Sequence, residues 1–215
     1  MTVRPEVRPG LYLVTPDWAD TARLERAVMQ ALVGRPALLQ YRSKQSDPAL
    51  RLEQAGRILR RCREAGVAMI VNDDLDLMRA VDADGLHIGR DDGDVAVLRN
   101  VVGEGRLLGV SCYDDLGRAQ TAEAAGADYV AFGAIYPSAT KPAATSAALG
   151  LLANARCELR CPIAAIGGIS LPRAAEVVAA GAQLLAVISD VFEDADPAGR
   201  AAAYGRLWAD PEAVA

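Results

Sequence analysis

Short apolar runs alternate with longer amphipathic segments along the chain. The runs are rich in Val, Ile, Leu and Ala, which is typical of strands buried on both faces. They predict strands at 11–14, 37–41, 68–71, 85–88, 107–110, 129–132, 163–166 and 184–188. The segments between them carry apolar residues at helical spacing. They predict helices at 19–32, 48–65, 75–80, 95–101, 117–125, 146–157, 172–180 and 198–208.

Eight strand-then-helix units within 215 residues favour an α/β fold, a (β/α)8 TIM barrel. An open doubly wound sheet is the alternative, but no G-x-G-x-x-G fingerprint follows the first predicted strand. We therefore expect one TIM-barrel domain over residues 1–215, with residues 1–10 as a short N-terminal extension.

A short phrase recurs where a predicted helix gives way to the next strand. It occurs at 65–67, 81–85, 125–129 and 180–184, and in each copy a glycine, or Asp82 in one case, ends the helix. Repeated short turns of this kind indicate a repeated structural unit, as in a barrel.

Composition narrows the class of protein and of partner. Apolar residues make up 52% of the chain and aromatic residues only 5%, so an aliphatic α/β core is expected. The net charge of −5 gives no basic field that would attract nucleic acid. No stretch approaches the ~18 apolar residues that span a membrane, and the charged first residues do not resemble a signal peptide. We expect no nucleic-acid or membrane partner, while a homo-oligomer is compatible with the sequence.

The cysteines and the single histidine offer no metal or nucleophile motif. Cys62, Cys112, Cys157 and Cys161 form no CxxC pair, which disfavours a zinc site and favours reduced thiols in a cytoplasmic protein. Cys112 is expected in the core, because no histidine adjoins it. For His87, inside a predicted strand, a hydrogen-bonded core position is favoured over a catalytic base.

Three polar side chains stand two residues apart at the end of the second predicted strand. Gln40, Arg42 and Lys44 would share a face, since side chains along a strand alternate. The intervening Tyr41 would face the surrounding helices. Two cations and an amide converging at a buried strand end are costly unless an anion meets them. The pattern predicts a site for a phosphorylated small molecule.

Acidic residues follow the third and fourth predicted strands. Two carboxylates from neighbouring strand ends, Asp73 and Asp92, suit Mg²⁺, which takes oxygen ligands and keeps several waters. Helix N-caps are the alternative, because Asp is a favoured N-cap. We favour the cap for Asp74, Asp91 and Asp94, and the metal for Asp73 and Asp92.

A second anion site is predicted after the last two strands, at 167–170 and 188–189. Glycine lets the backbone approach a phosphate, and the loops after the last two strands commonly form the phosphate-binding site of such barrels. Residues 137–148 are interpreted as a mobile loop on the same face. Two anion sites imply two phosphorylated ligands, or one with phosphate at each end. A metal ion would help pyrophosphate to leave the first ligand. Joining of the remaining fragment to the second ligand would be a transferase reaction.

Several motifs occur together in a specific order. They are Gln-x-Arg-x-Lys at 40–44, Asn-Asp at 72–73, Asp-Gly-Leu-His-Ile-Gly at 84–89, Gly-Val-Ser at 109–111, Pro-Ser-Ala-Thr-Lys at 137–141 and Ala-Ile-Gly-Gly-Ile at 165–169. With them, nearly the whole chain resembles the thiamine phosphate synthase family, also called thiamine-phosphate pyrophosphorylase. No single motif would be specific.

The resemblance implies a fold, a reaction and a set of site residues. The fold is a (β/α)8 barrel, and the enzyme is a Mg²⁺-dependent transferase of thiamine biosynthesis. It joins 4-amino-2-methyl-5-hydroxymethylpyrimidine diphosphate to a thiazole phosphate, releasing pyrophosphate and forming thiamine phosphate. The residues implied for the pyrimidine diphosphate are Gln40, Arg42, Lys44, Asn72, Ser111 and Lys141. Those implied for the thiazole phosphate are Ser138, Ala139, Thr140, Gly168, Ile188 and Ser189, and those for Mg²⁺ are Asp73 and Asp92.

The family reaction is dissociative, so pyrophosphate leaves before the thiazole nitrogen captures the pyrimidine cation. This agrees with the lack of a nucleophile or acid–base constellation in the chain. Catalysis would be electrostatic, through Arg42, Lys44 and Lys141.

The chain departs from the family pattern at four places. Asp74 stands where Arg is frequent, Arg90 where Gln is common, Cys112-Tyr113 where a small residue and His are frequent, and Ser138 where Thr is usual. Asp74 adds negative charge near the implied metal, which Arg90 would balance. A thiazole tautomerase-like or a non-catalytic phosphate-ligand-binding paralogue on the same barrel is the alternative. The tautomerase is disfavoured because Tyr113 replaces its acid–base group, and the retained metal acids disfavour a mere binding protein.

Overall fold

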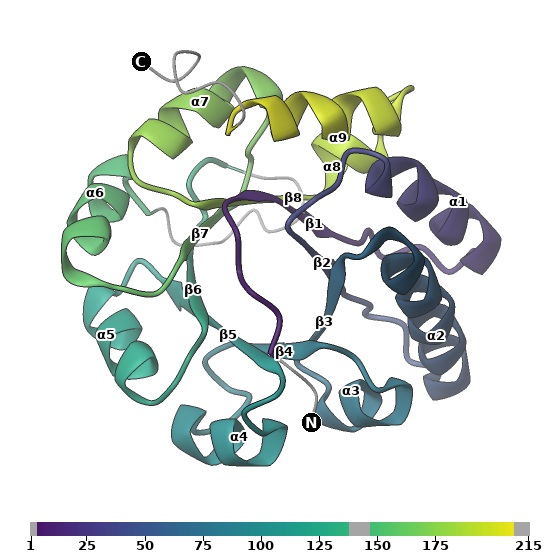
Figure 1. Cartoon of the computed structure of the whole chain (residues 1–215), viewed down its shortest axis with the longest axis horizontal. Coiled ribbons are helices and arrows are strands. Elements are labelled where there is room, and N and C mark those ends of the chain that lie inside the picture. The colour runs from purple at the N-terminus through teal and green to yellow at the C-terminus, as the bar shows by residue number, and fades with distance from the viewer. Residues whose placement is uncertain (1–3, 138–146, 209–215) are drawn as a thin grey trace.

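Eight parallel strands close into a barrel, and helices cover its outside (Figure 1). The computed structural model describes residues 4–137 and 147–208. The strands are β1 (Gly10–Val14), β2 (Leu38–Tyr41), β3 (Ala68–Asn72), β4 (Gly85–Ile88), β5 (Leu107–Tyr113), β6 (Tyr129–Phe132), β7 (Ile163–Ile166) and β8 (Leu184–Val187). Strand β1 pairs with both β2 and β8, which closes the sheet. The predicted (β/α)8 barrel is confirmed.

The helices follow the strands in the predicted order. They are α1 (Thr21–Leu32), α2 (Pro48–Ala65), α3 (Leu75–Val81), α4 (Val95–Val102), α5 (Leu116–Ala124), α6 (Leu149–Glu158), α7 (Leu171–Ala179), α8 (Ser189–Phe192) and α9 (Pro197–Arg206). Helix α8 is the one that the pattern did not predict, because four residues are too few to show a helical period. Strand β5 also runs beyond its apolar run, since its pairing with β6 continues past a register shift to Tyr113.

Aspartate begins most of these helices. The N-caps that accept a hydrogen bond from a backbone N–H of the first turn are Asp20, Asp47, Asp74, Asp94, Asp115 and Asp196. Each such cap contributes about 1 kcal/mol to helix stability. The caps predicted at Asp74 and Asp94 are confirmed. The cap predicted at Asp91 is wrong, because Asp94 starts α4 and Asp91 lies four residues before the helix.

The recurrent phrase has a second role at the amino ends of the strands. Asp84 accepts a hydrogen bond from Met69 N–H (2.8 Å), and Asp128 accepts one from Leu108 N–H (2.7 Å). Both aspartates stand directly before a strand and satisfy the backbone of the preceding strand. The repeated sequence thus supplies the polar partners that the open ends of a buried sheet require.

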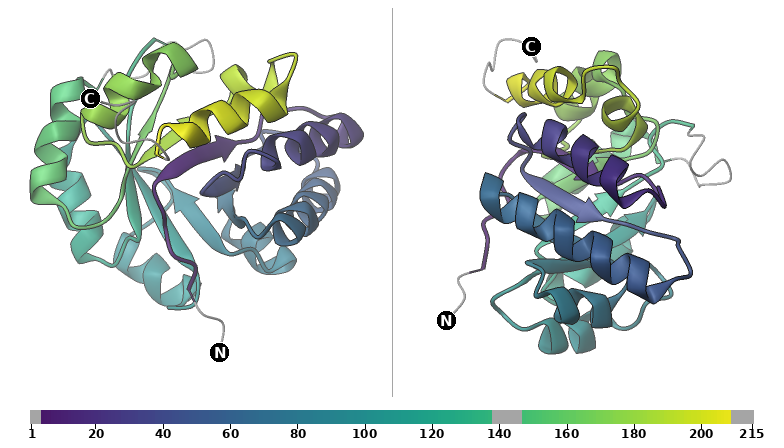
Figure 2. Two further views of the ribbon diagram at one scale, coloured as in Figure 1. Left: turned by 45° about the horizontal axis from the view of Figure 1, so that its top comes forward. Right: turned by 90° about the vertical axis from the view of Figure 1, so that its right-hand side faces the viewer.

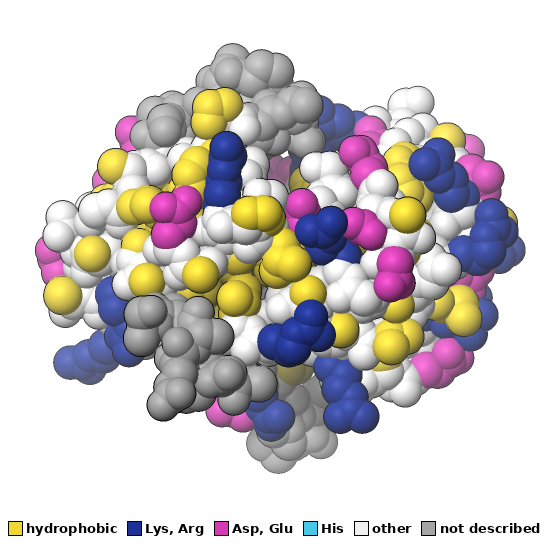
Figure 3. All heavy atoms as spheres, turned by 90° about the horizontal axis from the view of Figure 1, so that it is seen from above, with side chains coloured by type: hydrophobic (Ala, Val, Ile, Leu, Met, Phe, Trp, Pro, Cys, Tyr) yellow, Lys and Arg dark blue, Asp and Glu magenta, His cyan; other side chains and the backbone are white. Residues whose placement is uncertain are grey.

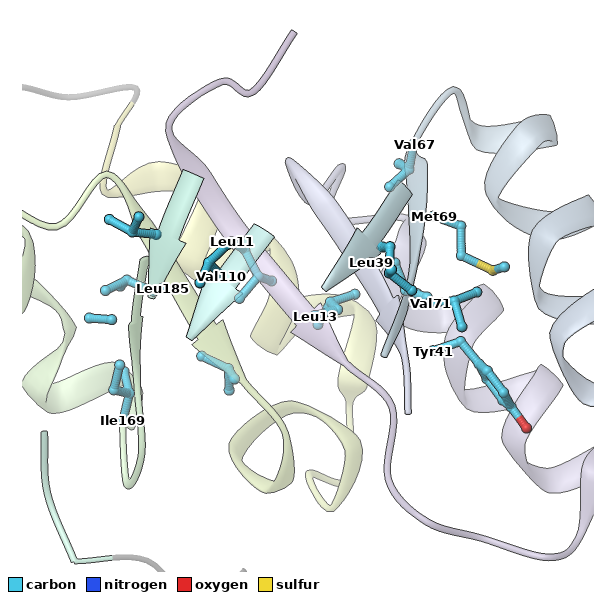
Figure 4. Close-up of a cluster of buried hydrophobic side chains, with 14 of the residues drawn as sticks. Leu11, Leu13, Leu39, Tyr41, Val67, Met69, Val71, Val110, Ile169 and Leu185 are labelled. Carbon is cyan, nitrogen blue, oxygen red and sulfur yellow. The ribbon is translucent and has the colours of Figure 1, made fainter. Parts of the chain in front are cut away.

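Side chains alternate between two cores. One set points outward from the strands against the helices, as Leu11, Leu13, Leu39 and Tyr41 do in Figure 4. The other set fills the barrel interior, where the buried polar residues Gln40 and His87 accompany mostly apolar side chains. The apolar and aromatic members of this interior core are Tyr12, Val14, Leu38, Ile70, Leu107, Tyr129, Ala131, Ala164, Leu184 and Ala186. The interior is therefore a packed core and not a pore.

The start of the described chain crosses the amino ends of the strands (Figure 2). Arg4 donates to the carbonyl of Glu104 and pairs with Asp128 (2.6 Å), and these partners precede β5 and β6. Val7 packs against the interior core. This segment covers the amino end of the barrel and leaves the carboxyl ends of the strands to form a site.

One face of the molecule carries charges of both signs. On the face shown in Figure 3, basic and acidic side chains are interspersed, in keeping with a net charge of −5. Within residues 4–137 and 147–208, no helix has the length and apolar character needed to cross a membrane.

Candidate active site

A polar pocket of about 210 Å³ lies at the carboxyl ends of β2 to β5. Its lining residues are Arg42, Asn72, Asp73, Gly89, Arg90, Asp91, Asp92, Ser111 and Tyr113. Five of the residues predicted for the diphosphate or the metal therefore line one pocket, although up to 69 positions of the chain separate them, from Arg42 to Ser111. A barrel creates this proximity because all its parallel strands end on one face.

Arg42 is held at the pocket by its backbone. Its N–H donates to the hydroxyl of Thr15 (2.8 Å), and that hydroxyl donates to the Arg42 carbonyl (3.1 Å). Thr15 follows β1 and is only 1% exposed. The two bonds tie the exits of β1 and β2 together, so the Arg42 guanidinium starts from a fixed point. Sequence reasoning did not single out Thr15, whose contact depends on the pairing of β1 with β2.

The other two members of the predicted basic motif lie elsewhere. Gln40 is inside β2, is 4% exposed and donates to the hydroxyl of Tyr12 (2.7 Å). Lys44 is exposed, and its backbone N–H donates to Asp17 (2.9 Å). Strand β2 ends at Tyr41, so strand alternation no longer aligns Lys44 with Gln40. Tyr41 itself faces the helices as predicted, donating to Gln54 of α2 (2.9 Å).

Asp73 and Asp92 adjoin one another across the exits of β3 and β4. The Asp73 backbone adopts a left-handed conformation (φ 60°), and its N–H donates to the His87 carbonyl (2.8 Å). The Asp92 carboxylate accepts from Gly89 N–H (2.6 Å). Partial desolvation and the neighbouring Asp92 carboxylate raise the pKa of Asp73 to about 6, although Asn72 and Arg42 act in the opposite direction. Two adjoining carboxylates leave negative charge that a cation would relieve.

This donor set fits a divalent cation with an oxygen preference. Mg²⁺ is commonly held by one or two carboxylates and completes its shell with water and phosphate oxygens. Within residues 4–137 and 147–208, no group of three or more His, Cys, Asp or Glu side chains forms a metal cluster. Asp73 and Asp92 would supply two oxygen ligands to such a cation, in keeping with its usual mixed shell of carboxylate, water and phosphate oxygens.

The departures at Asp74 and Arg90 do not compensate each other. Asp74 caps α3 through Leu77 N–H and pairs with Arg51 (2.8 Å). Its charge is thus balanced by a residue of α2. Arg90 instead lies over the ring of Tyr113, 4.7 Å from the ring centroid. The two departures Arg90 and Tyr113 stack together at the wall of the pocket, which the sequence alone did not indicate.

The exits of β7 and β8 lie side by side. Ile166 pairs with Ala186, so Gly168 and Ile188 each stand two residues beyond a paired position. Gly168 has a φ of 61°, and a Cβ there would lie 2.6 Å from the Pro137 carbonyl oxygen, so the close approach requires glycine. Ser189 begins α8 directly after β8. Ser138, Ala139, Thr140 and Lys141 lie outside the described residues.

The two residues that chemistry would first suggest as nucleophile or base are enclosed. Cys112 lies in the core as predicted, and burial raises the pKa of its thiol to about 12. His87 is a core histidine as predicted, 6% exposed, with Ser111 Oγ 2.9 Å from Nε2 and the Tyr129 hydroxyl 3.0 Å from Nδ1. Sequence reasoning did not single out the two interior tyrosines, Tyr12 and Tyr129, whose hydroxyls hydrogen-bond to each other (2.6 Å).

Comparison with known proteins identifies relatives along nearly the whole chain. The family model described as thiamine monophosphate synthase matches residues 11–191. A thiamine-phosphate synthase of Aromatoleum aromaticum is 61% identical over 199 residues, covering 93% of this chain and 96% of that protein. One from Azoarcus sp. is 58% identical over 200 residues, covering 93% and 97%. Among solved structures, thiamine phosphate pyrophosphorylase from Pyrococcus furiosus aligns with a TM-score of 0.82 and 29% identity, covering 95% of this chain and 96% of the other.

Proposed function

The chain belongs to the thiamine monophosphate synthase family, and from this premise we propose how its strand-end pocket serves the reaction. The protein is a thiamine-phosphate synthase, a transferase. The observation that carries this conclusion is the identity of up to 61% with named synthases over nearly the whole chain. Its reaction joins a pyrimidine diphosphate to a thiazole phosphate.

Arg42, Asn72 and Ser111 bind the diphosphate in this proposal, with Gln40, Lys44 and Lys141 completing the substrate contacts. The cationic and amide groups around the pocket support this assignment. Their role is to stabilise the charge that builds up on the departing pyrophosphate. The bond from the pyrimidine methylene carbon to the diphosphate oxygen breaks, and its electron pair leaves with pyrophosphate. The thiazole nitrogen then donates its lone pair to the same carbon, so no general base is required.

Asp73 and Asp92 hold Mg²⁺ in this proposal. Their adjoining carboxylates and the raised pKa of Asp73 support a cation between them. When bound, the ion supplies positive charge that makes pyrophosphate a better leaving group. The pocket walls, with Arg42 and Arg90 from separate strand exits, would add positive charge from the protein itself.

The thiazole phosphate binds at the exits of β7 and β8 in this proposal. The residues assigned to it are Ser138, Ala139, Thr140, Gly168, Ile188 and Ser189. Support comes from the bare backbone at Gly168 and from its proximity in register to Ile188. The proposal also includes a cytoplasmic location, consistent with the free thiols of the four cysteines.

One assay tests the function directly. Purified protein with Mg²⁺ and both substrates should form thiamine phosphate and pyrophosphate in equal amounts. A chelator should stop the reaction, and added Mg²⁺ should restore it. Absence of pyrophosphate release at saturating substrate concentrations would overturn the assignment.

Asp74→Asn is expected to leave the Mg²⁺ dependence unchanged. The substitution keeps an N-capping oxygen for α3 and removes a charge that Arg51 already balances. The Mg²⁺ concentration that gives half-maximal rate should stay within about twofold of the unsubstituted protein, since paired surface charges act weakly at a distance. A tenfold change in this concentration would instead show that Asp74 acts on the metal.

Ser189→Asp is expected to raise the KM for thiazole phosphate by at least about tenfold. A carboxylate at the start of α8 would repel the substrate phosphate. The repulsion energy between two like charges a few ångström apart is ~1–4 kcal/mol near a protein surface. Steady-state kinetics with each substrate varied in turn measures the effect. The KM for pyrimidine diphosphate serves as the internal control and should not change. Equal KM values for thiazole phosphate in both proteins would refute the placement.

A further inference from the structure

Five polar side chains form a continuous hydrogen-bonded chain inside the barrel. Gln40 Nε2 lies 2.7 Å from the Tyr12 hydroxyl, which lies 2.6 Å from the Tyr129 hydroxyl. The Tyr129 hydroxyl lies 3.0 Å from His87 Nδ1, and His87 Nε2 lies 2.9 Å from Ser111 Oγ. The chain thus begins and ends on residues assigned to the pyrimidine diphosphate. Its middle three members, Tyr12, Tyr129 and His87, are not among the described residues that line the strand-end pocket.

The arrangement of donors gives this chain one direction. The amide nitrogen of Gln40 only donates, so it occupies Tyr12 as an acceptor. Among the described residues, the other hydrogen-bond partner of the Tyr12 hydroxyl is Tyr129, so we infer that the Tyr12 proton goes to Tyr129. Tyr129 must then donate its own proton to His87 Nδ1.

The same logic fixes the far end. A histidine that accepts at Nδ1 carries its proton at Nε2 when neutral, and therefore donates to Ser111 Oγ. With its oxygen accepting from His87, the Ser111 hydroxyl proton is left to point into the pocket that Ser111 lines. Burial raises the pKa of both tyrosine hydroxyls, so neither loses the proton on which the direction depends.

The barrel makes room for this chain at one position. His87, Gly109 and Tyr129 are neighbours across β4, β5 and β6. A Cβ on Gly109 would overlap the Tyr129 ring and lie 2.6 Å from His87 Nδ1. The ring of Tyr129 also stacks on the imidazole, at a centroid distance of 5.6 Å. The missing side chain at position 109 is what lets the hydroxyl and the imidazole meet.

We propose that Tyr12, Tyr129 and His87 are positioning residues that orient Gln40 and Ser111 toward the pyrimidine diphosphate. Through them, Ser111 presents a hydroxyl donor and not an acceptor to the anionic substrate. Through them also, the amide nitrogen of Gln40 is held by the Tyr12 hydroxyl, which fixes the orientation of the amide group. This role rests on the proposed assignment of Gln40 and Ser111 to that substrate.

Tyr129→Phe interrupts the chain by removing one oxygen. We expect kcat/KM for pyrimidine diphosphate to fall about tenfold, as for the loss of one well-oriented hydrogen bond to a charged group. The KM for thiazole phosphate should stay unchanged. The matched control is Tyr41→Phe, which removes an equally buried hydroxyl bonded to an amide, Gln54, on the outer side of the sheet. It should lose similar thermal stability but keep both kinetic constants.

A double-mutant cycle tests whether Tyr129 acts through Ser111. In a Ser111→Ala background, Tyr129→Phe should lower kcat/KM by less than it does alone, because the serine it orients is gone. Equal effects in the two backgrounds would overturn the proposal. So would kinetics of Tyr129→Phe that match those of Tyr41→Phe.

A spectroscopic measurement tests the direction independently of turnover. His87 is the only histidine of the chain, so ¹⁵N-histidine labelling of untagged protein reports on this ring alone. We expect the neutral Nε2–H tautomer in the unsubstituted protein and a changed tautomer balance in Tyr129→Phe. A dominant Nδ1–H tautomer, or an unaltered spectrum in the variant, would overturn the chain's direction. Because the spectroscopic measurement needs no substrate, it tests the hydrogen-bonded chain even if the proposed function is wrong.

Discussion

Asp73→Asn is expected to lower Mg²⁺-dependent turnover by more than about a hundredfold. Loss of even an outer partner of a metal ligand costs ~10–100-fold, and here a proposed ligand loses its charge. Asparagine is the informative replacement because Asp73 has a φ of 60°, a conformation that Asn tolerates and Ala does not favour. The measurement is the rate as a function of Mg²⁺ concentration, together with Mn²⁺ binding followed by electron paramagnetic resonance.

Asp91→Asn is the matched control. It makes the same change of charge at a residue that lines the same pocket, directly before the second proposed metal ligand, Asp92. A general electrostatic role would give both variants similar losses. A ligand role for Asp73 predicts a much smaller loss in Asp91→Asn, so comparable rates in the two variants would contradict the proposed metal site.

Asp73→Asn should also stabilise the metal-free protein. Partial desolvation and Asp92 raise the pKa of Asp73 from 3.8 to about 6, so the ionised carboxyl disfavours the folded state at pH 7. This penalty is fully present above the folded pKa and disappears as the pH falls below 3.8. Asp73→Asn should therefore raise the Tm at pH 7, and the gain should shrink toward pH 4. A lower Tm at pH 7 would contradict the account of this carboxylate pair.

Local signals were enough to predict most of the elements. Helix α2 has its predicted bounds, because Asp47 caps it, Pro48 opens it and Gly66 ends it in the left-handed conformation. Strands β4, β6 and β7 also have their predicted bounds, since short apolar runs there end at turn residues or polar ones. Each of these signals lies within a few positions of the element it defines.

Contacts between distant strands were beyond the reach of such signals. Tyr12 and Tyr129 meet across 117 positions, because the closed barrel places β1 and β6 on opposite walls of one interior. Their apolar surroundings made them resemble ordinary core residues. The alignment expected of Gln40 and Lys44 depended on strand geometry that ends at Tyr41. The sequence therefore indicated several of the polar residues that line the pocket, but not how Gln40 and Lys44 lie relative to it.

Gly109→Ala is expected to destabilise the protein by about 3 kcal/mol and to lower its Tm by roughly 6–12 °C. The added Cβ would overlap the Tyr129 ring and lie 2.6 Å from His87 Nδ1. Tyr129 is fully buried and hydrogen-bonded on both sides, so the ring has no free space into which to move. Thermal and urea unfolding monitored by circular dichroism measure the change.

Gly56→Ala is the matched control for the same chemical change. Gly56 lies inside α2, and no heavy atom lies within 4 Å of its added Cβ. Alanine there should stabilise the helix by about 0.5–1 kcal/mol, because glycine is the poorer helix former. The two variants should thus move the Tm in opposite directions. A small effect of Gly109→Ala would mean that the interior yields easily at this position.

A second substitution identifies the cause of the Gly109→Ala penalty. Tyr129→Leu removes the ring atoms that the new methyl would meet, at the expense of a cavity and of both hydroxyl contacts. In the Gly109→Ala background its cost should be smaller than in the unsubstituted protein, because it also relieves the overlap. Strictly additive free energies of unfolding would show that the strain lies elsewhere in β5. A clear coupling between the two positions would instead establish that the absent side chain at 109 exists to admit the Tyr129 hydroxyl to the barrel interior.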